Sequence, residues 1–160
     1  MGAEETRVLL FPKSAMTREI VNALRATGPW HDARTPSADP TCENLELDDG
    51  EHLIEAEVQD MPPRLSLRFA LCNPETVDTI FVGLVSRLAR MLDAQVRVVG
   101  ASELAACSFS SPDLHGLDSA LQQNIEDERK LWQQEFGGET LKATCEEAVV
   151  EFILRRRGGS

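Results

Sequence analysis

The side chains best suited to covalent chemistry in this sequence are four cysteines and three histidines. They are Cys42, Cys72, Cys107 and Cys145, and His31, His52 and His115. A nucleophilic thiol needs a base within hydrogen-bond reach. The sequence leaves two such pairs open, Cys42 with His52 and Cys107 with His115, if the fold brings them together. In the alternative interpretation, Cys72 and Cys145 pack as small apolar side chains, and Cys42 and Cys107 lie in loops.

Motifs for other reactions and for cofactors are missing from the sequence. There is no GxSxG nucleophile elbow, no CxxC pair, no HExxH spacing and no glycine-rich loop after a strand. Asp48, Asp49 and Glu51 are close enough in sequence to suggest a divalent cation. They fall in a predicted hairpin turn, where solvated carboxylates are the more common outcome. The sequence therefore predicts a protein that is not an enzyme and has no cofactor and no bound metal.

The distribution of charge is the most informative feature. The chain has a formal net charge of −11, and nine acidic residues lie between Asp39 and Asp60 without a single Lys or Arg. We call residues 39–60 the acidic stretch. Its acidic members are Asp39, Glu43, Glu46, Asp48, Asp49, Glu51, Glu55, Glu57 and Asp60.

Two interpretations of the acidic stretch are open. In the first, the acids form a solvated face whose charge protects a sheet from aggregation, and Arg64 and Arg68 offset Glu55 and Glu57 from the next strand. In the second, they attract a basic partner, which speeds association and selects the partner. The second interpretation predicts a partner-binding set. Its members are Glu43, Glu46, Asp48, Asp49, Glu51, Glu55 and Glu57, together with Trp30.

Trp30 lies in a proline-rich segment, where an aromatic side chain is either a partner anchor or a lid that packs back on the domain. Packing is the favoured interpretation. The prolines and small polar residues of 29–41 predict a loop.

Composition narrows the class of protein. A pI of about 4.7 argues against binding nucleic acid or an anionic membrane surface, since both need clustered basic residues. No apolar run approaches the roughly 20 residues of a membrane span, and no secretory signal is evident. Dispersed cysteines are typical of a reducing compartment, so a cytoplasmic location is predicted. The length predicts one domain over residues 1–157 and a frayed tail over 158–160.

Hydrophobic periodicity predicts the elements of this domain. Strands are predicted over 7–11, 45–48, 52–59, 64–71 and 95–99, and helices over 15–27, 74–92, 112–136 and 139–156. The run VVEFIL within 139–156 leaves a strand open there. The order β-α-β-β-β-α-β-α-α predicts an α+β fold with a mainly antiparallel sheet and helices packed on one face.

One segment carries a family resemblance. Residues 84–100, LVSRLARMLDAQVRVVG, read as an amphipathic helix that runs straight into a short strand, and an acidic meander precedes them. Over residues 43–100 this pattern resembles the small acidic α+β immunity proteins of bacterial toxin systems. The resemblance implies a cytosolic, non-enzymatic protein that covers the active site of a cognate toxin. It assigns no role to any single residue.

A second resemblance is to the acidic chaperones of type III secretion, which dimerise and hold an unfolded segment of an effector. Those chaperones usually begin with a helix, whereas this chain begins with a strand. The sequence thus predicts an immunity-type inhibitor of a basic toxin domain. The alternatives are an acidic secretion chaperone or adaptor for an effector domain, and an enzyme with a Cys/His site. Formation of a homodimer stays open.

Overall fold

A computed structural model describes residues 5–33, 39–71, 73–99 and 107–136, with only the backbone of residues 107, 135 and 136. These residues form seven strands and three helices. The element predicted over 139–156 and the tail over 158–160 lie outside the described residues.

All seven strands belong to one sheet in which every neighbouring pair is antiparallel. The order across the sheet is β2-β3-β4-β5-β1-β6-β7. The strands are β1 (Glu5–Pro12), β2 (Trp30–Asp32), β3 (Cys42–Asp48), β4 (Leu53–Gln59), β5 (Arg64–Ala70), β6 (Ala94–Val99) and β7 (Cys107–Ser110). The predicted α+β class and antiparallel sheet are confirmed.

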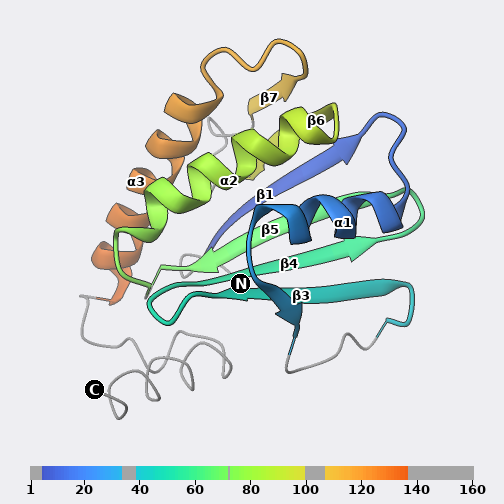
Figure 1. Cartoon of the computed structure of the whole chain (residues 1–160). Coiled ribbons are helices and arrows are strands. Elements are labelled where there is room, and N and C mark those ends of the chain that lie inside the picture. The colour runs from blue at the N-terminus through green and yellow to red at the C-terminus, as the bar shows by residue number, and fades with distance from the viewer. Residues whose placement is uncertain (1–4, 34–38, 72, 100–106, 137–160) are drawn as a thin grey trace.

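The first strand lies inside the sheet, between β5 and β6. After β1, helix α1 (Thr17–Thr27) carries the chain to the far edge at β2, and the meander β2 to β5 returns it to the side of β1. Helix α2 (Val77–Met91) then leads to β6 on the other side, β7 forms the second edge, and α3 (Leu117–Phe136) follows. Figure 1 shows the three helices on the same face of the sheet.

The core lies between that face and the helices. Alternate residues of β4 and β5 point toward the helices and are at most 3% exposed, as the predicted alternation requires. They are Ile54, Ala56, Val58, Leu65, Leu67 and Phe69. Phe81 of α2 meets Phe69 edge to face, with ring centroids 4.8 Å apart. This contact joins α2 to the middle of the sheet.

Two short strands were not predicted. Within the expected loop over 29–41, β2 pairs with β3, and Trp30 stands opposite Leu47. The second is β7, which pairs with β6. Strands of three and four residues are too short to display a period of two, so only the partner strand reveals them.

All three helices in the described part begin later than predicted, and α3 begins at Leu117. Helix α1 begins at Thr17, where the side chain of Glu19 accepts a hydrogen bond from the amide of Met16 at 3.2 Å. Helix α2 begins at Val77. Asn73, the residue before the predicted start of this helix, accepts a hydrogen bond from the backbone amide of Leu53 at 2.7 Å. Asn73 therefore ties the start of β4 to the chain before α2, and it does not cap the helix.

A buried ion pair fastens α3 to the rest of the domain. The guanidinium of Arg129 donates to both carboxylate oxygens of Asp78 on α2, at 2.6 and 3.1 Å, and to the carbonyl of Leu71 at 3.1 Å. The two charged side chains are 15% and 13% exposed. Because the three contacts join α3, α2 and the end of β5, this pair fixes the position of α3.

Within the described residues, no helix combines the length and apolar character needed to cross a bilayer.

Candidate functional site

The acidic stretch folds mainly into the β3–β4 hairpin. Its register places Asp48 opposite Leu53 at the turn and Cys42 opposite Gln59 at the far end. The carboxylates are therefore divided among the turn, the far end, and the sheet face that points away from the helices, which we call the back face. The stretch does not form a single patch.

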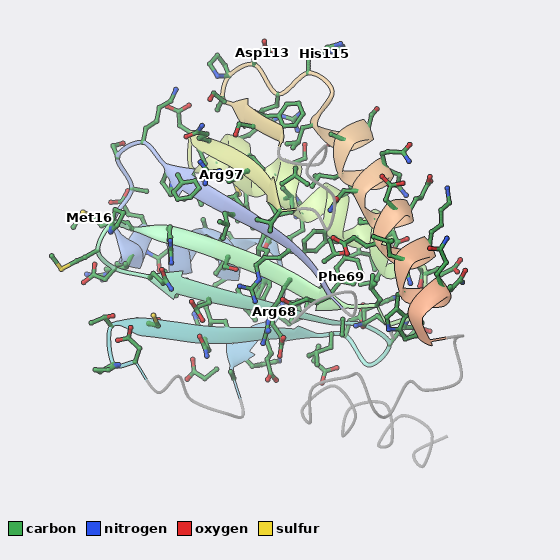
Figure 2. All side chains as sticks on the ribbon, turned by 180° about the vertical axis from the view of Figure 1, so that it is seen from behind. Met16, Arg68, Phe69, Arg97, Asp113 and His115 are labelled. Carbon is green, nitrogen blue, oxygen red and sulfur yellow. The ribbon has the colours of Figure 1, made fainter. Side chains whose placement is uncertain are left out.

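Arginines neutralise part of the back face. Glu55 stands opposite Arg68 in the sheet, and the Arg68 Nε lies 2.8 Å from a Glu55 oxygen. Arg68 also reaches Glu5 at 3.0 Å, and Glu5 pairs with Arg7 at 2.9 Å. Figure 2 views the sheet from this side, with Arg68 near its middle. The predicted offset of Glu55 by Arg68 is confirmed.

Glu57 has a different environment from the one predicted. Ser66, and not Arg64, lies opposite it on β5. The side-chain amide of Gln59 donates from Nε2 to a Glu57 oxygen at 2.7 Å. Arg64 stands one pair further along, opposite Gln59.

Two residues of the predicted binding set are buried. Glu46, expected on a wet face, lies on the back face but is 6% exposed. Trp30 is 3% exposed, packs within the core, and donates from Nε1 to the hydroxyl of Thr27 at 3.1 Å. The favoured packing interpretation of Trp30 agrees with this position.

Side-chain hydrogen bonds hold the β3–β4 turn. Asp48 accepts the amide of Gly50 at 2.9 Å, and Asp49 accepts the amides of Glu51 and His52 at 2.9 and 2.6 Å. Gly50 has a φ of +88°, a conformation that favours glycine. Asp49 and Glu51 are exposed, whereas Asp48 is half-buried. The turn thus presents carboxylates from a fixed backbone.

His52 links this turn to helix α2. Its Nδ1 lies 2.9 Å from Asp49 Oδ2, and its Nε2 lies 2.6 Å from the hydroxyl of Thr76, just before α2. The imidazole is 5% exposed. Sequence reasoning missed this cluster because Thr76 is 24 residues away from His52. The Asp49–His52 spacing was the only local signal for it.

Asp49 is held in its charged form. Partial burial raises the pKa of its carboxyl group, but hydrogen bonds from the His52 ring and from the amides of Glu51 and His52 outweigh burial. The net pKa lies below the ordinary value of 3.8. Asp49 therefore carries its negative charge throughout the neutral and mildly acidic range.

This low pKa predicts how the hairpin responds to acid. A carboxyl group with a lowered pKa in the folded state stabilises the protein above its unfolded pKa, and that contribution is lost as the pH falls through the folded pKa. Asp49→Asn should therefore be less stable than the wild type near pH 7, and the difference should shrink below about pH 4. Urea unfolding of both proteins across this range measures it. An equal difference at every pH would assign the effect to turn geometry alone.

Cys42 does not meet the requirements of a nucleophile. Burial raises the pKa of its thiol, and the charge of Asp39, 3.6 Å from Sγ, raises it further. Reactive thiols have lowered pKa values. Cys42 and His52 also lie at opposite ends of the hairpin, about 20 Å apart for six residues of strand. The Cys42–His52 pair that the sequence left open is therefore not formed. The pair of Cys107 with His115 involves a side chain outside the described part.

In the described part of the chain, no three His, Cys, Asp or Glu side chains lie close enough together to hold a metal ion.

Comparison of the chain with known protein families, with curated proteins and with solved structures finds no match.

Proposed function

We propose that this protein acts by binding a basic protein partner, as an immunity-type inhibitor that covers a toxin domain. The observation that supports this most is the exposed carboxylates of Asp49 and Glu51, held on a fixed turn. Glu43 adds a third exposed carboxylate on the same hairpin.

Rigidity makes these carboxylates suited to recognition. The amides of Gly50, Glu51 and His52 are all bonded to aspartate side chains, and His52 fastens the turn to the residue before α2. A surface that is already ordered loses less conformational entropy when a partner binds. Its charge then increases the association rate more than it increases affinity.

The arginines on the back face narrow the proposed surface. Because Glu55 is paired with Arg68 and Glu46 is buried, we place the contact at the ends of the hairpin and leave its middle out. A span of about 20 Å between those ends is comparable with the width of an ordinary protein–protein interface.

The strands of the sheet give little support to the secretion-chaperone alternative. It requires apolar strand residues that accept an extended segment, yet the apolar residues of β4 and β5 are buried beneath the helices. The acidic charge is expected of both an immunity-type inhibitor and a secretion chaperone, so it does not distinguish the two functions. A dimer in light scattering, with an effector segment bound, would favour the chaperone.

The test uses the product of the reading frame next to this one as the candidate partner. Glu43→Gln combined with Glu51→Gln should slow association severalfold at about 20 mM salt and make the rate less dependent on salt. Stopped-flow mixing measures the rates. Glu126→Gln removes an exposed acid from α3 and is the matched control, expected to leave the rate unchanged. Identical rates for all three proteins at low salt would contradict the proposal.

A further inference from the structure

The cluster of Asp49, His52 and Thr76 links a carboxylate, an imidazole and a hydroxyl group in that order. This arrangement can activate the hydroxyl as a nucleophile. The hydroxyl of Thr76 lies 2.6 Å from His52 Nε2, and His52 Nδ1 lies 2.9 Å from Asp49 Oδ2. Both distances are within the reach that proton transfer and ring orientation require. We propose that Thr76 is the nucleophile of an acyl-transfer site, with His52 as general base and Asp49 as its positioning residue.

The hydrogen bonds determine where the protons lie when the imidazole is neutral. An ionised carboxylate only accepts, so His52 carries its proton on Nδ1 and donates it to Asp49. Nε2 then presents a lone pair and accepts the hydroxyl proton of Thr76. This is the tautomer that a general base needs in order to activate a hydroxyl.

Burial and exposure are distributed as such a site requires. The His52 ring is 5% exposed, so packing and its two hydrogen bonds hold its orientation. Thr76 is an exposed residue, so a substrate can approach it from solvent. Thr76 also stands immediately before α2, where the positive end of the helix dipole stabilises negative charge that develops on a substrate oxygen.

The proposed step exchanges one ester for another. The Thr76 oxygen attacks the carbonyl carbon while its proton passes to His52 Nε2. The carbon–oxygen bond to the leaving alcohol then breaks, and the alcohol takes that proton. Water, activated by the same nitrogen, cleaves the threonyl ester and releases the carboxylic acid and free Thr76.

Nearby charge selects the class of substrate. Glu75 is exposed beside Thr76, and Glu51 is exposed on the adjoining turn. Carboxylates repel anionic acyl groups, so the site suits esters that are neutral or cationic. This activity goes beyond partner binding. It can be assayed with the protein and an ester alone, so its test does not depend on a partner.

The probe is p-nitrophenyl acetate, with release of p-nitrophenolate followed by absorbance and the acetylated residue located by peptide mass mapping. The wild type should carry acetyl on Thr76. Thr76→Val should lose that label and release p-nitrophenolate at least about 100-fold more slowly from this site. Thr76→Ser should retain both. Thr79→Val removes another exposed threonine of α2, which has no hydrogen bond to a histidine in the described part of the chain, and this variant should behave as the wild type.

Asp49→Asn tests the positioning role. It should lower the acylation rate at saturating ester by at least about tenfold and leave the KM unchanged, because Asp49 orients the base and does not contact substrate. Circular dichroism establishes that each variant is folded. Acetylation confined to the exposed His31, His115 or lysines, with equal rates for Thr76→Val and the wild type, would overturn the proposal.

Discussion

Replacing Arg129 with methionine is expected to lower the free energy of unfolding by about 3 kcal/mol. The substitution leaves the carboxylate of Asp78 nearly buried and without its guanidinium partner, and a buried charge that loses its partner costs about 3–5 kcal/mol. The carbonyl of Leu71 loses a donor as well. Urea unfolding followed by circular dichroism measures the change.

A double-mutant cycle separates the ion pair from general packing. Asp78→Leu with Arg129→Met replaces both charges by apolar groups, so it should be more stable than the sum of the single effects predicts, by at least about 1 kcal/mol. Asp93→Asn is the control, since its contact with Lys13 is exposed and 3.6 Å long. The control should change stability by less than about 0.5 kcal/mol. Additive single effects would show that the pair does not act as a unit.

Phe69→Ala is expected to have the largest effect in the core, about 4 kcal/mol. Phe69 and Phe81 are both completely buried and pack edge to face, and removing a buried phenyl ring loses its transfer free energy and opens a cavity. Chemical unfolding again measures the loss. Because the ring lies where α2 meets the centre of the sheet, its neighbours have little freedom to close the gap.

Phe11→Ala is the matched control for that prediction. Phe11 is half-buried, and its ring faces the guanidinium of Arg97 at 5.7 Å. Such a contact contributes about 0.5–1 kcal/mol at an exposed site, so the control should cost clearly less than Phe69→Ala. Equal losses from the two substitutions would contradict the assignment of the core to the helix-covered face.

The sequence allowed the long elements to be predicted and left the short ones out. β4 and β5 alternate over seven residues, and α2 repeats its apolar positions over four turns, so their periods are visible. β2 and β7 have no such length. The order of the strands could not be predicted from the sequence, because β1 pairs with β5 and β6, which lie far away along the chain.

The candidate site was predicted in part. The Asp49–Gly50 turn and the pairing of Glu55 with Arg68 follow from turn chemistry and strand register. The burial of Glu46 does not, because alternation gives the face of a side chain but not what covers it. The contact between His52 and Thr76 depends on how the hairpin meets α2, and no local pattern encodes that.

The interior position of β1 has a consequence during synthesis on the ribosome. β1 is made before both of its neighbours, because β5 begins at Arg64 and β6 ends at Val99. At a translation rate of about 5–20 residues per second, both edges of β1 stay unpaired for several seconds. The β3–β4–β5 meander can already form during that time. β1 is thus made before its neighbours but is inserted into the sheet late. Until then its apolar residues are exposed, and they are a natural binding site for a chaperone of nascent chains.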